Sequence, residues 1–151
     1  MQVPLTPITF TFGKEEKLKL RKDIETLFRT GKAFSILPLR VIYTIKPVAD
    51  HTQILPIQIG VSVPKKRFKH AVDRNRCKRV IRENWRLQKH TLLPLLSTNY
   101  QLQLFFVYQS NKLPVYTEIE LIMPRIISKL EEILHLHNQH THDQANTTGD
   151  H

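Results

Sequence analysis

Alternating apolar and polar residues predict three β-strands in this chain. The clearest alternation lies in residues 54–63, where one face carries only β-branched side chains: Ile57, Ile59, Val61 and Val63. Such a run is typical of a strand with one buried face. Residues 39–45 (LRVIYTI) and 101–109 (QLQLFFVYQ) are also rich in strand-forming residues and are predicted to be the other two strands.

Apolar residues spaced three or four positions apart predict three helices, over residues 14–30, 71–87 and 115–136. Gly31 is well placed to end the first helix, because glycine is common just beyond a helix C-terminus. Pro124 lies inside the third pattern. We therefore expect this proline to kink the helix or to mark where its regular part begins.

The elements follow in the order α-β-β-α-β-α, which predicts an α/β domain of the α+β two-layer sandwich kind. We expect a small mixed sheet with helices on one face, the other face remaining as an open, concave surface. Residues 1–14 are predicted to be an extended N-terminal arm and residues 15–136 a single domain. The polar residues 137–151 are predicted to be a disordered tail.

Positive charge adds a functional prediction to this fold. The chain carries 23 Lys and Arg residues against 13 Asp and Glu, a formal net charge of +10. Such a surplus in a small protein favours a polyanionic partner. Residues 65–89 hold 11 of the basic residues and only two acids, Asp73 and Glu83. Charge gathered in this way is typical of a binding surface, whereas a solvated surface spreads its charges.

On a helical wheel, residues 71–87 divide into a packing side and a cationic side. The packing arc contains Cys77, Val80, Ile81 and Leu87, with Asn84 between them. The opposite side gathers Arg74, Asn75, Lys78, Arg79, Arg82 and Arg86, with Arg76 near one margin. Like charges four residues apart repel each other by about 0.2–0.5 kcal/mol per pair. Phosphate contacts would offset that repulsion and make the affinity strongly salt-dependent.

Three alternative roles for the cationic helix fit its pattern less well. A solvated helix face normally interleaves acids, and this one barely does. A helix lying on a membrane needs larger apolar residues than this packing side offers. Nothing else in the chain favours a target helix of the calmodulin type. Nucleic acid is therefore the partner that the pattern favours, although the pattern does not say which nucleic acid.

Further features of the sequence narrow the class of protein. No apolar run approaches the roughly 18 residues of a membrane span, and the N-terminus lacks the pattern of a secretory signal. Cys77 is the single cysteine and cannot form an internal disulfide, so we expect a cytoplasmic protein without a membrane partner. Five of the eight histidines lie at positions 135–151, without a cysteine or a rigid frame, so we expect no metal site in the protein. We also predict no catalytic side chain, because no nucleophile–base constellation stands out.

Residues 60–83 (GVSVPKKRFKHAVDRNRCKRVIRE) closely resemble the signature segment of the bacterial ribonuclease P protein component family. The matching positions are Lys65, Lys66, Ala71, Val72, Arg74, Asn75, Arg76, Lys78, Arg79 and Arg82. Residues 20–35 (LRKDIETLFRTGKAFS) resemble the first helix of that family and the turn that ends it. Pro64 departs from the family pattern, which commonly has serine there.

The resemblance implies a protein subunit of the ribonuclease P ribonucleoprotein, which removes the 5′ leader of precursor tRNA endonucleolytically. In that family the basic loop and helix dock on the catalytic RNA, and a left-handed crossover through the helix joins two parallel strands. The implied RNA-binding residues are Lys65, Lys66, Arg67, Lys69, Arg74, Asn75, Arg76, Lys78, Arg79, Arg82 and Arg86. The chemistry would belong to Mg²⁺ held mainly by the RNA, and no obligate protein partner is implied.

The resemblance also implies contacts with the single-stranded leader of precursor tRNA. Phe28 and Tyr43 match aromatic positions that contact the leader in the family. Aromatic rings stack on unpaired bases of many sequences. Packing roles compete with these assignments, since Phe28 also fits the core of an amphipathic helix and Tyr43 also fits strand packing. Ile24 stands where the family often has phenylalanine, which weakens a full aromatic platform.

Two functions of different kinds remain alternatives. A ribosomal or ribosome-associated RNA-binding protein, with no catalytic role, would use the same basic surface and co-purify with ribosomal subunits. A DNA-binding protein would insert the basic helix into a major groove and prefer duplex DNA to structured RNA.

Overall fold

The computed structural model describes residues 17–47, 57–96 and 100–148, with side chains up to Thr141. The elements are α1 (Arg21–Thr30), β1 (Lys32–Ile36), β2 (Leu39–Pro47), β3 (Ile57–Ser62), α2 (Ala71–Gln88), the short 3-10 turns η2 (Lys89–Thr91) and η3 (Leu93–Leu95), β4 (Tyr100–Tyr108) and α3 (Tyr116–Thr148). The predicted α+β class is confirmed, with one strand more than the sequence pattern predicts. The predicted arm, residues 1–14, lies outside the described residues.

The four strands form one mixed sheet in the order β1-β2-β4-β3. β2 pairs antiparallel with both β1 and β4, and β3 pairs parallel with β4. Since α2 lies between β3 and β4 in the chain, it forms the crossover between these parallel neighbours. A crossover at this place agrees with the family resemblance, and its left-handedness stays a prediction.

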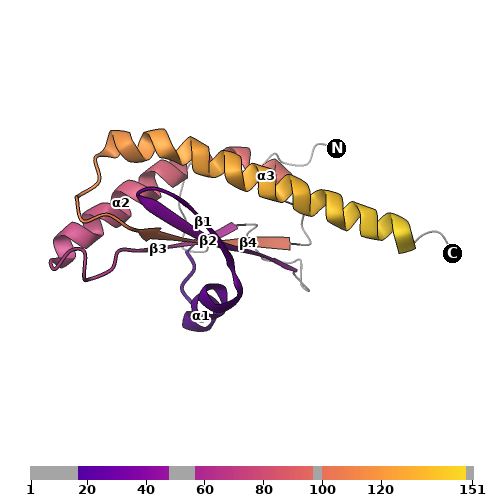
Figure 1. Cartoon of the computed structure of the whole chain (residues 1–151), viewed down its shortest axis with the longest axis horizontal. Helices are drawn as coiled ribbons and strands as arrows, with labels where there is room; N and C mark the ends of the chain where they lie inside the picture. The colour runs from indigo at the N-terminus through magenta and orange to yellow at the C-terminus, as the bar shows by residue number, and fades with distance from the viewer. Residues whose placement is uncertain (1–16, 48–56, 97–99, 149–151) are drawn as a thin grey trace, which may run out of the picture.

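Helices α2 and α3 cover one face of the sheet, and α1 lies against the other face (Figure 1). The expectation that the helices share one face therefore holds for α2 and α3 but not for α1. Leu27 of α1 packs with Ile42 and Phe105 from the second face. The apolar stripe of α1 needs a buried partner, so α1 occupies part of the face that the sequence pattern predicts to be open.

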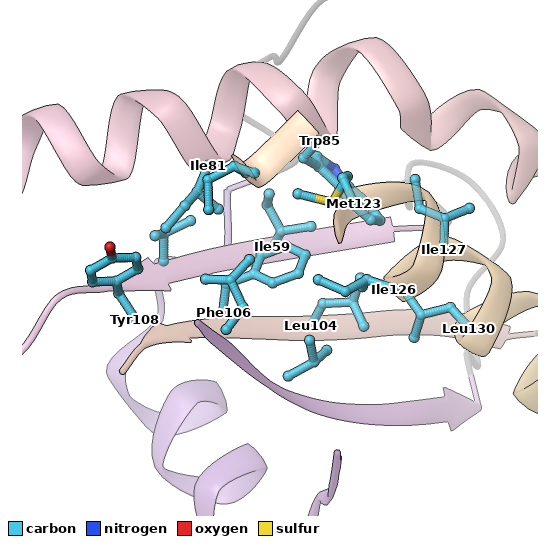
Figure 2. Packing of buried hydrophobic residues seen from close by; sticks show 14 of the residues in the cluster. Ile59, Ile81, Trp85, Leu104, Phe106, Tyr108, Met123, Ile126, Ile127 and Leu130 are labelled. Carbon is cyan, nitrogen blue, oxygen red and sulfur yellow. The ribbon is translucent and has the colours of Figure 1, made fainter. Parts of the chain in front are cut away.

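The larger hydrophobic core fills the space between the sheet and the pair α2 and α3 (Figure 2). Its largest side chains include Ile59, Leu104, Phe106 and Tyr108 from the sheet, Ile81 and Trp85 from α2, and Met123, Ile126 and Leu130 from α3. The rings of Trp85 and Phe106 meet edge to face, with centroids 5.5 Å apart. The alternation predicted for residues 54–63 is confirmed over the described residues 57–63, because all four β-branched side chains are buried.

The predicted packing side of α2 is correct in its centre and wrong at its end. Cys77, Ile81 and Asn84 are fully buried, as expected, but Leu87 is 38% exposed. Trp85, which the predicted arc omits, is fully buried. The buried line therefore runs through Cys77, Ile81 and Trp85 at four-residue spacing, and it leaves Leu87 at the solvent margin.

Near the N-terminus the structure differs from the sequence prediction in two ways, and both arise from backbone pairing between segments that no local pattern shows. β1 is a five-residue edge strand whose side chains are mostly exposed, so it lacks a clear alternation. Its turn to β2 contains Leu37 and Pro38 rather than the Asn-Gly or Asp-Gly that typically marks a hairpin. Helix α1 begins at Arg21 rather than residue 14, because Lys17 forms a parallel bridge with Ile59 and the Leu18 N–H donates to the Ile59 carbonyl.

Helix α3 is longer than the sequence pattern predicts. It continues through the exposed Pro124 and past residue 136 to Thr148, and so enters the segment assigned to the polar tail. The Asn138 side chain donates to the Leu95 carbonyl at 3.0 Å. The His137 ring packs edge to face on Tyr100, with centroids 4.7 Å apart. These two contacts hold the helix against the domain beyond its predicted end.

Candidate nucleic-acid interface

The exposed side of α2 and the loop before it form a cationic surface. We use this name for seven residues that make no ion pair with an acid of the described chain: Lys65, Lys66, Lys69, Arg76, Lys78, Arg79 and Arg82. The gathering that the charge pattern predicts is therefore present, and these side chains are not neutralised by described carboxylates. Charges left unpaired in this way can contact phosphates.

Arg74 has a different role from its neighbours, because its guanidinium is used within the protein. Its Nη1 donates to the carbonyl oxygens of Phe68 at 2.8 Å and Lys69 at 2.9 Å. Residue His70, which precedes α2, provides no side-chain cap for the helix. Arg74 thus fastens the basic loop to the first turn of α2 and holds the loop lysines in a set position beside the helix.

A second tie anchors the same loop to the sheet. Arg67 Nη1 donates to Asn111 Oδ1 at 3.1 Å, which joins the loop to the turn after β4. Phe68 is buried, and its ring lies 6.0 Å from that of Tyr108. The cations of this loop are therefore held in place before any partner binds, which lowers the entropy cost of forming phosphate contacts.

Part of the cationic side of α2 borders a groove of about 370 Å³. The groove is lined by Lys17, Asn75, Arg79, Arg82, Glu83 and Arg86. Arg86 Nε donates to Glu83 Oε2 at 3.1 Å, and this hydrogen bond is the main cause that lowers the pKa of the Glu83 carboxyl. Arg86 is the one predicted RNA-binding residue that pairs with an acid in the described chain.

Lys17 lies at this groove although no sequence pattern marks it as a site residue. It reaches the groove because it bridges to Ile59 at the edge of the sheet. A helix expected from residue 14 would place it elsewhere. The mixed charges at residues 14–19 (KEEKLK) give no signal of this pairing, so only the tertiary structure identifies it.

The three predicted leader-binding residues do not lie together. Phe28 is 48% exposed on α1, and its ring contacts that of Phe105. Ile24 packs against the small buried cluster to which Phe105 belongs. Tyr43 lies on the opposite face of the sheet, half-buried, with its ring 6.0 Å from that of Phe34. Burial raises the pKa of the Tyr43 hydroxyl. The structure therefore brings Ile24 and Phe28 together and places Tyr43 on the α3 side.

Gly60 of β3 makes room for the aromatic ring against which Phe28 packs. A Cβ atom at Gly60 would lie 2.5 Å from the Phe105 ring, so only glycine leaves room for this ring over the strand. The Phe105 ring in turn meets Phe28 edge to face, with centroids 4.9 Å apart. The outer side of the Phe28 ring remains accessible to a flat partner such as a base.

Chemistry by the protein's own cysteine is disfavoured by its position. Cys77 is fully buried on the packing side of α2. Burial raises the pKa of its thiol, and the charge of Asp73 raises it further. Among the described residues no three His, Cys, Asp or Glu side chains gather to hold a metal. Within the same ranges no helix is long and apolar enough to cross a membrane.

Comparison with known proteins identifies the family. The family model described as Ribonuclease P matches residues 12–120, most of the chain. The chain belongs to the ribonuclease P protein family. The ribonuclease P protein component of Porphyromonas gingivalis is 39% identical over 126 residues, which cover 83% of this chain and 90% of the relative. That of Nostoc punctiforme is 31% identical and covers 80% of this chain and 90% of its own length.

Solved structures of the ribonuclease P protein family share this fold. The RNase P protein of Staphylococcus aureus superposes with a TM-score of 0.59 at 22% identity, over 78% of this chain and 96% of that chain. At this identity the likeness supports the fold alone. The family resemblance carried by residues 20–35 and 60–83 is confirmed by the family match and by the curated relatives.

Proposed function

We propose that this member of the ribonuclease P protein family, a component of the tRNA 5′-processing ribonucleoprotein, docks on the catalytic RNA through the cationic surface. The observation that carries the proposal is the set of unpaired cations along α2 and its loop, held in place by Arg74 and Arg67. Phosphate contacts at these positions would release counterions and give an affinity that falls steeply with salt. Asn75, Arg86 and Lys17 extend the surface into the neighbouring groove.

The precursor leader is proposed to touch the protein near the C-terminal end of α1. Phe28 lies there with an exposed ring, and Ile24 packs beside it. Gly31 turns the chain from α1 directly into β1, and Lys32 of β1 pairs with Tyr43 of β2. A single-stranded RNA leader that passes around this end of α1 could therefore contact Phe28 on one side of the sheet and Tyr43 on the other.

In this proposal the protein supplies binding and positioning, and the RNA supplies the chemistry. Hydrolysis of the phosphodiester bond would depend on Mg²⁺ held mainly by the RNA. The protein's cations would neutralise phosphates between the two RNAs, and leader contacts would hold the precursor in a productive position. The site of action is proposed to be the cytoplasm, and the holoenzyme acts as the endoribonuclease.

Reconstitution with the cognate ribonuclease P RNA tests the proposal. The purified protein should stimulate cleavage of precursor tRNA at low Mg²⁺, where phosphate repulsion limits the RNA alone. The protein should also raise the affinity of the holoenzyme for a precursor with a leader more than it raises the affinity for mature tRNA. If the folded protein binds its RNA but leaves cleavage unchanged across Mg²⁺ concentrations, the proposed role is wrong.

The RNA that co-purifies with the protein separates this role from a ribosomal one. A single structured RNA with the ribonuclease P core supports the proposal. Ribosomal subunits, with no effect on precursor cleavage, would support the alternative of a ribosome-associated protein.

A further inference from the structure

The exposed ring of Phe28 has a buried aromatic partner in the sheet face that α1 covers (Figure 1). Phe105 of β4 meets it edge to face, with an angle of 67° between the two ring planes. Phe105 itself is buried in the small cluster that also contains Leu27 and Ile42. Packing therefore fixes the Phe105 ring, and this fixed ring supports a ring that is half open to solvent.

The place of the Phe105 ring depends on the residue beside it in β3. Gly60 is the register partner of Phe105 in the parallel pair of β3 and β4. A Cβ atom at Gly60 would lie 2.5 Å and 2.6 Å from two carbon atoms of the ring, well inside van der Waals contact. Any larger residue at this position would have to displace the ring. Three elements thus meet at one point: β3 leaves the space, β4 supplies the supporting ring and α1 supplies the exposed ring.

The angle of the Phe28 ring matters for a partner that stacks on it. A base binds to the face of an aromatic ring, so the direction of that face decides where the base can lie. An exposed side chain that turns freely loses this freedom when a partner binds, and the loss weakens binding. An edge-to-face contact is a favoured geometry for two rings, so Phe105 removes part of that freedom from Phe28 before any base arrives.

We propose that Phe105 is a positioning residue for the leader contact, which holds the Phe28 ring at the angle at which an unpaired base stacks, and that Gly60 provides the space for it. This inference rests on the proposed function, which assigns Phe28 to the leader of precursor tRNA. It goes beyond that assignment because Phe105 is buried and acts on the leader only through Phe28. The sequence pattern marks neither Gly60 nor Phe105 as a site residue, since both lie within strands.

Phe105→Leu in the reconstituted holoenzyme tests the positioning role. Leucine keeps the site apolar but offers no ring to Phe28. We expect the affinity for a precursor with a leader to fall about threefold, seen as a higher KM with an unchanged kcat, and the affinity for mature tRNA to stay the same. Phe106→Leu is the matched control, because Phe106 is the next residue of the same strand but is buried in the larger core, where it meets Trp85.

Phe28→Ala separates this inference from the proposed function. The substitution should lower precursor affinity about tenfold, and adding Phe105→Leu should then lower it no further, because residues that act through one contact are not additive. Additive losses, or an equal loss in Phe106→Leu, would overturn the positioning role while the leader contact of Phe28 stands. If Phe28→Ala leaves precursor affinity unchanged, the leader contact of the proposed function fails, and the positioning role fails with it.

Two measurements on the protein without RNA test the structural part of the inference. Gly60→Ala should lower the urea midpoint of unfolding, and should lower it much less when Phe105 is replaced by alanine, because the added methyl group then meets no ring. Equal losses in both backgrounds would show that Gly60 does not serve Phe105. In NMR spectra the Phe28 ring signals of the unmodified protein should carry a ring-current shift that Phe105→Leu abolishes and Phe106→Leu retains. A shift that survives Phe105→Leu would overturn the proposal even if the glycine variant does not fold.

Discussion

Helices α2 and α3 both lay an apolar stripe on the same face of the sheet (Figures 1 and 2). The residues that they present to solvent nevertheless differ. The exposed side of α2 carries six basic residues of the helix against Asp73 and Glu83. The described part of α3 mixes signs, with acids at Glu118, Glu120, Glu131 and Glu132 and bases at Arg125 and Lys129. Lys129 even pairs with Glu132, at 3.7 Å.

The difference shows that the buried stripe and the exposed stripe of a helix carry separate information. Both buried stripes contribute to one core, so the apolar pattern of the sequence predicts both helices as parts of the fold. α2 keeps four basic residues in a row at four-residue spacing, Arg74, Lys78, Arg82 and Arg86, at a cost in helix stability, whereas α3 has a single such pair, Arg125 and Lys129. That cost is the physical reason to assign the polyanion to α2 and to treat the outer face of α3 as solvated surface.

The largest effect is expected from a substitution in the hydrophobic core to which both helices contribute. Trp85→Ala deletes the fully buried indole that α2 places against Phe106, and should lower the free energy of unfolding by about 3–5 kcal/mol. Urea denaturation followed by circular dichroism measures this change. Leu87→Ala is the control on the same helix, because Leu87 is 38% exposed and its truncation should cost less than about 1 kcal/mol. Equal losses in the two variants would contradict the packing described for α2.

The next largest effect should distinguish the exposed side of α2 from the exposed side of α3. Arg79→Ala combined with Arg82→Ala should weaken binding to the catalytic RNA about tenfold or more and reduce the slope of log affinity against log salt by about 2. Filter binding across KCl concentrations measures both quantities.

The matched control for this pair is Arg125→Ala with Lys129→Ala, which removes the same charge from the outer face of α3. Affinity and salt slope should then change little. Similar losses from both double variants would mean that net charge, rather than the cationic surface, attracts the RNA.

Local patterns predict much of this molecule because they record what each segment buries. The β-branched face of β3 and the charge of α2 are both visible in consecutive residues, and both are confirmed in the structure. β1, the bridge of Lys17 to Ile59, and the position of α1 depend instead on pairing between distant segments. Tyr43 shows the same limit, since alternation places it on a face but cannot say that α3 lies over that face.

A smaller effect distinguishes two arginines of the same motif. Arg74→Ala removes the hydrogen bonds to the Phe68 and Lys69 carbonyls. Amide hydrogen exchange in residues 65–70 should become faster, and RNA affinity should fall several-fold, in line with about 1 kcal/mol per lost hydrogen bond. Arg76→Ala should lower affinity without changing exchange, because Arg76 makes no hydrogen bond to the loop in the described structure. Unchanged exchange in Arg74→Ala would show that Arg74 does not position the loop.

The smallest effect concerns Glu83, the acid that interrupts the cationic side of α2. Its pKa is lowered by the hydrogen bond from Arg86, so the carboxyl stays ionised at neutral pH and would compete with a phosphate for the Arg86 guanidinium. Glu83→Gln keeps the size of the side chain but removes the charge, and should raise RNA affinity about twofold at low salt. The gain should shrink as KCl increases, because screening weakens an exposed pair. Filter binding at two salt concentrations tests this expectation, and a loss of affinity would show instead that Glu83 orients Arg86 toward the RNA.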